Sequence, residues 1–324
     1  MAGKMDCHGM TDIGRVREVN EDQFLIADLI KSMRIHETSL SHDDQTRLFG
    51  DSQGKLFVVA DGVSGQSGGR QASTIAIDEV LHYVLNSMRW FFRLTEDPED
   101  DFVDDLKAAM EHCQSRFEIE MSQTPRRYRM ATTLTMGYVV WPRLYVVHAG
   151  DSRCYLFRES RLEQITNDHT MAQKYIDHGL AKPGQVEGTR WSNVLWNVLG
   201  GDSNEVRPSV YKAELRVGDT LLFCSDGLNK HVGDAEIADL LKCDASAEQL
   251  CSQLIDAANA GGGTDNITAV IALFREVEVT KEAASLEAVV EEDTLQQNAD
   301  KNLEPIKQFN EASRHAATEP AAGM

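Results

Sequence analysis

The stretch that decides the fold is Leu56-Phe57-Val58-Val59-Ala60-Asp61-Gly62, in which five apolar residues are followed at once by an aspartate and a glycine. A short run rich in Val and Phe predicts a buried β-strand. Taken alone, an Asp-Gly pair after such a run is most simply a hairpin turn. The same arrangement recurs along the chain, however, and a turn does not explain this repetition.

Four further acidic sites share this position at the junction of a predicted strand and a loop: Asp151 after Leu144–Ala149, Asp226 after Thr220–Cys224, Asp265 before Ile267–Phe274, and Glu21-Asp22 before Gln23–Ala27. Hard cations such as Mg²⁺ and Mn²⁺ prefer oxygen ligands, usually a few carboxylates together with waters. Carboxylates fixed at the ends of rigid strands meet this demand. The sequence therefore predicts a divalent-cation site built from acids.

The other predicted elements indicate the fold class. Two more runs, Thr132–Val140 and Cys154–Arg158, are typical of strands. Helices are predicted over Gly69–Trp90, Phe102–Met121, His169–His178, Ala235–Lys242 and Ala247–Ala260. Because the long helices come in groups and not after every strand, the pattern favours an α+β fold with largely antiparallel sheets over a doubly wound α/β fold.

Composition limits the partners and the compartment. The formal net charge of −20 disfavours nucleic acid and anionic membrane as partners, since both attract Lys/Arg patches. No apolar run reaches transmembrane length. The six cysteines form no C-x-x-C pair, which is typical of reduced thiols and predicts a cytoplasmic protein.

The chain divides into two regions by composition. Residues 276–324 carry eleven Asp/Glu against four Lys/Arg, with Phe309 as their only aromatic residue. Such a segment cannot bury much apolar surface, so we predict a catalytic domain over residues 1–275 and an acidic, disordered tail over 276–324.

Two other phosphate- and metal-binding motifs are absent from the sequence. It contains no G-x-x-x-x-G-K-[ST] phosphate loop and no H-E-x-x-H metal motif. The ten histidines form no pair with ligand spacing, and we expect His148 and His169 to be structural.

The order of motifs resembles the metal-dependent type 2C protein phosphatases, the PPM family, in their bacterial form. Eight segments carry this resemblance, which runs from about Asp6 to Phe274: Thr11–Asp22, Val58–Gly65, Ala131–Leu134, Ala149–Arg153, Thr166–Thr170, Asn193–Leu195, Cys224–Leu228 and Gly263–Thr268. The family implies a four-layer αββα sandwich, in which two antiparallel sheets are flanked by helices. It also implies a binuclear metal centre in a cleft at one end.

The resemblance assigns the ligands of that centre by position. Asp61 resembles the acid that bridges two Mn²⁺ or Mg²⁺ ions, and Gly62 the residue that offers its carbonyl oxygen. Asp226 and Asp265 match the acids that complete the shell of one ion. The acids that hold metal-bound waters correspond to Glu21 and Asp22.

Two further residues have implied roles. Arg17 matches the arginine that binds the substrate phosphate. Asp151, together with Asp226, matches the site of a third, weakly bound ion. The family implies that the ions lower the pKa of a bridging water, whose hydroxide attacks phosphorus. The predicted function is therefore hydrolysis of phosphoserine and phosphothreonine on proteins, with Arg17 and Asp61 at the reaction centre.

Two segments depart from the family pattern. Animal members carry a histidine, proposed as general acid, where this chain has Val63, and bacterial members carry Gly-Gly-His where it has Ser64-Gly65-Gln66. The segment Leu180–Ser192 falls where the family has a variable flap. Its Arg190 and Trp191 either contact the substrate or belong to a surface loop with one packed tryptophan.

Two other functions stay open at this point. A degenerate family member could serve as a binding module, although all the metal-binding acids are present, and an enzyme of this kind could act on a small phosphomonoester. For the protein phosphatase, the resemblance implies a signalling role, substrates phosphorylated by a bacterial Ser/Thr kinase, and a monomeric state.

Overall fold

The computed structural model describes residues 4–34, 47–63, 68–88, 99–123, 130–186, 188–202 and 205–275. Two predictions fall elsewhere. The acidic tail 276–324 and the Ser64-Gly65-Gln66 segment both lie outside the described residues.

Two five-stranded sheets form the centre of the domain, and all their neighbouring strands are antiparallel. The first sheet has the order β1 (Lys4–Asp12), β12 (Ile267–Arg275), β11 (Thr220–Cys224), β7 (Arg153–Arg158) and β8 (Arg161–Gln164). The second has the order β10 (Ser209–Glu214), β6 (Arg143–Ala149), β5 (Leu134–Val140), β3 (Arg47–Ala60) and β2 (Gln23–Arg34). A short pair, β4 (Ala131–Thr132) and β9 (Leu199–Gly200), lies apart from both sheets.

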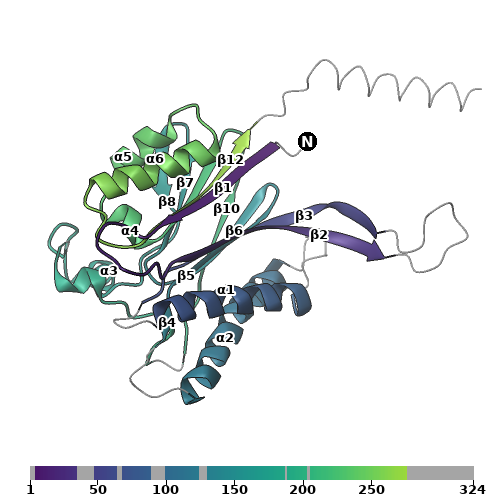
Figure 1. Cartoon of the computed structure of the whole chain (residues 1–324), viewed down its shortest axis with the longest axis horizontal. Coiled ribbons are helices and arrows are strands. Elements are labelled where there is room, and N and C mark those ends of the chain that lie inside the picture. The colour runs from purple at the N-terminus through teal and green to yellow at the C-terminus, as the bar shows by residue number, and fades with distance from the viewer. Residues whose placement is uncertain are drawn as a thin grey trace, which may run out of the picture. The chain divides into compact units, whose positions relative to one another are not determined.

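Helices cover the outer face of each sheet (Figure 1). The second sheet is covered by α1 (Gly69–Asn86) and α2 (Glu99–Gln123), and the first by α5 (Asp234–Leu241) and α6 (Ala247–Ala260). Three short helices, α3 (Met171–Asp177), η1 (Arg190–Asn193) and α4 (Asp226–Asn229), lie in the connections. The predicted αββα sandwich is confirmed.

Burial on both faces explains the unbroken apolar run of strand β3. All five residues of Leu56–Ala60 are fully buried. Alternate side chains of a strand point to opposite faces. Leu56, Val58 and Ala60 therefore pack under α1 and α2, whereas Phe57 and Val59 pack into the core between the two sheets. A strand covered on both faces needs apolar residues at every position.

Four strands, β1, β8, β9 and β10, were missed by the sequence prediction, and β4 and β5 were joined into one. Strands β1, β8 and β10 contain polar or small residues, because each lies at the edge of a sheet and is only partly covered. The predicted strand Thr132–Val140 is divided at Thr133 into β4 and β5. Pairing with distant segments, which no local pattern reveals, completes two of these edges. Strand β10 pairs with β6, and β1 lies along the full length of β12, although β1 and β12 are at opposite ends of the domain sequence (Figure 1).

No helix within the described residues combines the length and the apolar character that crossing a membrane requires.

The contact between the two sheets gives a stability prediction. Phe223 of β11 is fully buried and stacks on Phe57 of β3 with a ring separation of 5.6 Å. Truncating a buried Phe loses its transfer free energy and leaves a cavity, so Phe223→Ala should lower the free energy of unfolding by about 3–5 kcal/mol. Chemical denaturation checks this, with Val217→Ala in an exposed turn as the control. A loss below about 1 kcal/mol would show that this contact does not hold the sheets together.

Candidate metal centre

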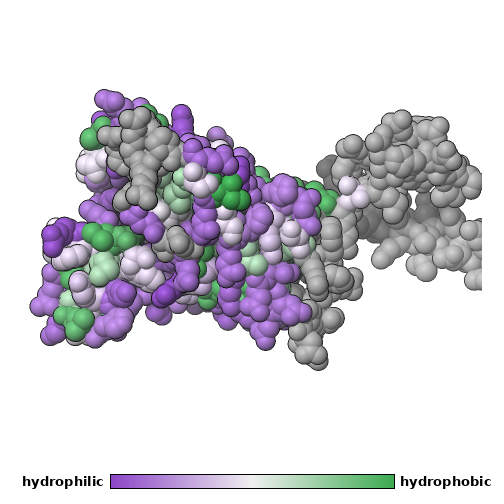
Figure 2. Space-filling view, turned by 90° about the horizontal axis from the view of Figure 1, so that it is seen from below, coloured by the Kyte–Doolittle hydropathy of each residue, from purple (hydrophilic) through white to green (hydrophobic). Residues whose placement is uncertain are grey.

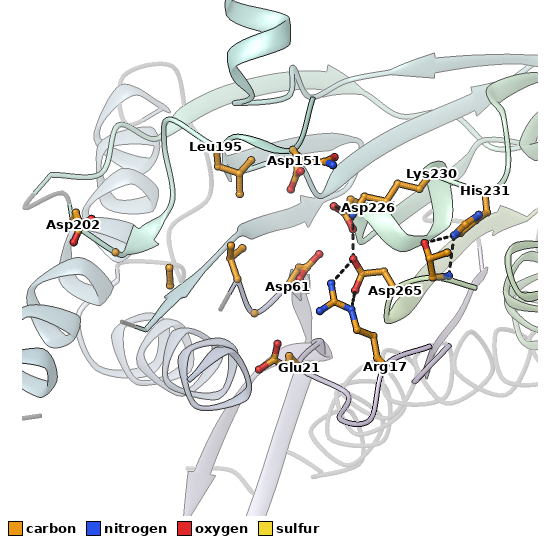
Figure 3. A pocket seen from close by; sticks show the side chains of 16 residues that line it. Arg17, Glu21, Asp61, Asp151, Leu195, Asp202, Asp226, Lys230, His231 and Asp265 are labelled. Carbon is orange, nitrogen blue, oxygen red and sulfur yellow. Dashed lines mark hydrogen bonds and ion pairs between the residues drawn. The ribbon is translucent and has the colours of Figure 1, made fainter. Parts of the chain in front are cut away.

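One cleft of about 900 Å³ brings together seven of the eight predicted site residues: Arg17, Glu21, Asp61, Gly62, Asp151, Asp226 and Asp265 (Figure 3). Six of them lie in loops beside strands of the two sheets, and Asp226 is the first residue of the short helix α4. The eighth residue, Asp22, is only 2% exposed and is absent from the lining of this cleft. The predicted residues thus converge on one place. Apart from the Arg17–Asp22 segment and the Asp61-Gly62 pair, they are far apart in the sequence.

Hydrogen bonds from the Ala131-Thr132-Thr133 segment fix Asp61. The Asp61 amide donates to Thr133 Oγ1 at 3.0 Å, and the Asp61 carbonyl accepts from the Thr133 amide at 2.9 Å and from Thr132 Oγ1 at 2.8 Å. The Val63 amide then donates to the Ala131 carbonyl at 2.8 Å. These contacts continue the strand pairing past the end of β3 and leave the Asp61 carboxylate facing the cleft (Figure 3).

Gly62 is required by a close approach of the backbone. A Cβ atom at Gly62 would lie 2.4 Å from the carbonyl of Gly69, at the start of α1. A Cβ atom at Gly69 would lie 2.7 Å from the Glu21 carboxylate and 2.8 Å from the Gly62 carbonyl oxygen. Only glycine at both positions allows the end of β3, the first turn of α1 and Glu21 to meet at the cleft.

Asn266 and Thr268 hold the loop that carries Glu21 and Asp22. Asn266 Oδ1 accepts from the Glu21 amide at 2.8 Å, and its Nδ2 donates to the carbonyls of Ile13 and Val19, both at 3.0 Å. Asp22 Oδ2 accepts from Thr268 Oγ1 at 2.7 Å. The last strand of the domain thus fixes the position of Glu21 and Asp22.

A histidine positions the turn before Asp151. The His169 amide donates to the Gly150 carbonyl at 2.6 Å, and the Gly150 amide donates to His169 Nδ1 at 3.2 Å. Burial lowers the pKa of His169 to about 4, so its ring is neutral at physiological pH. Its neighbour His148, with a ring centroid 4.6 Å away, has its pKa lowered to about 3 by burial and by His169. Both histidines support the loop and do not line the cleft.

Two cations contact the acids on the side of the first sheet. Arg17 Nε and Nη2 lie 2.8 and 2.9 Å from the two oxygens of Asp265. Lys230 Nζ lies 2.5 Å from Asp226 Oδ2 and 3.1 Å from Asp265 Oδ2. Burial alone would raise the pKa of Asp265, but the hydrogen bond from Arg17 and the charge of Lys230 outweigh it and lower that pKa below its ordinary value.

The other acids resist ionisation. Burial, followed by the charge of Asp22, raises the pKa of Asp61 well above its ordinary value. The pKa of Asp151 is raised likewise by burial and by the charges of Asp226 and Asp168. Burial also raises the pKa of Asp226, although Lys230 opposes this shift, and it raises the pKa of Asp22 to about 7. This cluster of buried carboxylates lacks enough positive charge to balance it.

The donor set fits hard divalent cations. Asp22 Oδ1 and Asp226 Oδ1 are buried and have no hydrogen-bond partner among the described residues. A buried oxygen without a partner lowers the stability of the fold unless a cation or a water binds it. No group of three or more His, Cys, Asp or Glu in those residues is arranged to hold an ion directly. Water would therefore complete much of the shell of any bound ion, which is usual for Mg²⁺.

Comparison with known proteins agrees with this geometry. The family model described as "Protein phosphatase 2C" matches residues 33–272. The chain belongs to the protein phosphatase 2C family.

Named relatives of this family match much of the domain. The Serine/threonine protein phosphatase PstP of Mycobacterium tuberculosis is 35% identical over 218 residues, which are 67% of this chain and 40% of PstP. The chain therefore spans about two fifths of that relative's length. The Serine/threonine phosphatase stp of Listeria welshimeri is 27% identical over 262 residues, which are 81% of this chain and 92% of stp.

A solved structure of the family is similar throughout the domain. The crystal structure of the catalytic domain of PstP in complex with two manganese ions has a TM-score of 0.63 and 28% identity, and the match covers 84% of this chain and 99% of that one.

The flap of this phosphatase 2C domain borders a second hollow of about 690 Å³. Thr189, Ser192 and Asn193 line it, and it shares Asn193 and the acids Asp151 and Asp226 with the cleft of the acids. Arg190 and Trp191 are in the lining of neither. Instead the Arg190 guanidinium lies 4.3 Å from the Trp191 ring centroid, and that ring packs edge-on against Tyr175. The structure thus favours the surface loop with one packed tryptophan.

Sequence reasoning missed Lys230 and the supporting role of Asn266. Lys230 follows Asp226 by one helical turn, a spacing at which opposite charges meet. That signal was available, but a short helix at 226–229 was not predicted. Asn266 stands inside a recognised motif, and only the fold shows that its side chain reaches across to residues 13–21.

The raised pKa of Asp22 predicts how the metal-free protein responds to pH. Its value rises from 3.8 to about 7 on folding, so the proton-bound form stabilises the fold below about pH 4, and this stability is lost as the pH rises through 7. Asp22→Asn cannot ionise, and its amide oxygen can still accept from Thr268. In EDTA, the variant should therefore melt several degrees above wild type at pH 8 and close to wild type at pH 4.5. A difference in melting temperature that does not change with pH would contradict the raised pKa.

Proposed function

We propose that this protein is a Ser/Thr protein phosphatase that hydrolyses phosphoserine and phosphothreonine with a centre of two Mn²⁺ or Mg²⁺ ions. The observation that carries the proposal is the cleft in which Asp61, Asp226 and Asp265 converge beside Arg17. Two buried carboxylate oxygens there or behind it, those of Asp22 and Asp226, have no hydrogen-bond partner among the described residues. Family membership and the names of the relatives support the same activity.

We assign the ligands as follows. Asp61 would bridge the ions and Gly62 would offer its carbonyl, while Asp226 and Asp265 would complete one shell. Glu21 and Asp22 would hold waters of the shell, and Asp22 would do so through its Oδ1, which has no hydrogen-bond partner among the described residues. When bound, the ions supply an acidified water and neutralise charge on the phosphate.

Arg17 is the proposed phosphate-binding residue. Its side chain is 46% exposed and reaches from the loop after β1 to the floor of the cleft (Figure 3). The fork of the guanidinium can hold two phosphate oxygens. In this structure Asp265 holds the same fork, which fixes its direction. Val63, at the position of the animal histidine, is 40% exposed and cannot donate a proton.

The shape and surface favour protein substrates. The cleft of the acids opens into the hollow beside the flap, so residues next to a phosphorylated side chain have room to bind. The face in Figure 2 is mainly hydrophilic, with hydrophobic residues in small separate groups. We therefore propose a monomer that acts in signalling on proteins phosphorylated by a bacterial Ser/Thr kinase. Its six cysteines are all free thiols, which supports a cytoplasmic location.

Release of phosphate from a phosphothreonine peptide tests the activity. It should require Mn²⁺ or Mg²⁺ and vanish in EDTA. Asp61→Asn removes the charge of the bridging ligand and should slow turnover by about three orders of magnitude or more. Asp239→Asn, at an exposed position on α5, is the matched control and should leave the rate unchanged.

Three outcomes separate this proposal from its rivals. Full turnover after chelation would contradict the metal-dependent mechanism. Cleavage of small phosphomonoesters without cleavage of any phosphopeptide would favour a small-molecule phosphatase. Absence of turnover on both substrates, with intact folding and bound Mn²⁺, would favour a binding module.

We also propose that residues 1–275 form the whole catalytic unit. Strand β12 ends at Arg275, which pairs with Lys4 at the start of β1, so the first sheet is complete at that point. A chain ending at Arg275 should therefore keep its melting temperature within about two degrees and its nitrophenyl phosphate turnover within about twofold, because an acidic, apolar-poor tail adds little burial. A large drop in melting temperature would show that residues 276–324 stabilise the domain.

A further inference from the structure

Lys230 is placed in the cleft by the same turn of helix that carries Asp226. Its amide donates to the Asp226 carbonyl at 2.9 Å, just past the end of α4. Residues four apart lie on the same face of a helix, so the two side chains point the same way. The Lys230 side chain is only 32% exposed, and among the residues that line the two hollows it is the only lysine.

The two oxygens of Asp226 have different surroundings. Oδ1 is buried and has no hydrogen-bond partner in the described part of the chain, so it is available to an ion of the binuclear centre. Oδ2 lies 2.5 Å from Lys230 Nζ and is already neutralised by it (Figure 3). Asp226 can therefore bind one ion and keep its lysine.

A third ion held by Asp151 and Asp226 would need the second oxygen. That oxygen is in contact with an ammonium group, and a divalent cation placed on it would face a positive charge at close range in a partly buried site. Asp151 has a second cation nearby: Arg153, two residues away in the chain, which is paired with Asp168 at 2.7 Å. Lys230 and Arg153 thus already supply positive charge beside Asp226 and Asp151.

We propose that Lys230 supplies, as a tethered ammonium group, the positive charge that a third divalent ion would otherwise bring to Asp151 and Asp226. This inference rests on the proposed two-ion centre and adds that the protein binds two divalent ions and no more. The lysine stays in place at any cation concentration, so the charge on this side of the cleft does not depend on the supply of metal.

The number of bound Mn²⁺ ions tests the proposal. Free Mn²⁺ can be counted by its electron paramagnetic resonance signal while the full chain is titrated to millimolar metal. Wild type should bind two ions, and Lys230→Met should bind three. Lys230→Arg keeps the charge and should bind two. Lys242→Met is the matched control, because Lys242 forms a similar short pair with Asp239 on the exposed end of α5, and it should also bind two.

A second variant assigns the additional ion to its ligand. The double variant Lys230→Met, Asp151→Asn should return the count from three to two, whereas Asp151→Asn alone should leave it at two. Circular dichroism establishes that each variant is folded. Should Lys230→Met not fold, Lys230→Gln serves in its place, and a wild-type count of three overturns the proposal whatever the variants bind.

The failures are distinguishable. Three ions on wild type, or two on the folded Lys230→Met or Lys230→Gln variant, would overturn the role of Lys230 and leave the phosphatase proposal intact. Fewer than two ions on wild type would overturn the binuclear centre and this inference together.

Discussion

The structure depends on one electrostatic constraint, which is that several carboxylates are buried together at the end of a β-sandwich. Burial and mutual repulsion raise the pKa values of Asp22, Asp61, Asp151 and Asp226. Charges of one sign can stay in such a place only if cations meet them. Arg17 and Lys230 supply part of this positive charge. One oxygen each of Asp22 and Asp226 has no hydrogen-bond partner in the part of the chain that the structure describes. The fold therefore defines a place for added positive charge.

The rest of the domain holds these charges against their repulsion. Each acid lies near the end of a paired strand, and side chains from other segments lock the loops: Thr133 holds Asp61, Thr268 holds Asp22, and His169 holds the turn before Asp151. Three apolar cores make the strands rigid. A site built on such a frame is organised before ions or substrate arrive, which is a main source of electrostatic catalysis.

The sequence was informative where the chemistry is local. The apolar run before Asp61 predicted β3, and repetition of that pattern predicted the cation site. Edge strands such as β10 escaped prediction because half-covered residues need no regular pattern. Lys230 escaped because the short helix that brings it beside Asp226 was not predicted, and because its second contact, with Asp265, crosses 35 residues. Asn266 was recognised as part of a motif, but its function as a clamp on residues 13–21 belongs to the three-dimensional structure.

The most direct test of the central claim is anomalous diffraction from crystals of the full chain grown with Mn²⁺, recorded at the manganese absorption edge. If the strand-end acids exist to hold a pair of cations, the anomalous map will show two peaks at Asp61, with Asp226 and Asp265 beside one of them. It will show Lys230 still in contact with Asp226 and no peak between Asp226 and Asp151. A map without manganese at Asp61 would contradict the account, because the buried charges would then have to be balanced by the protein alone.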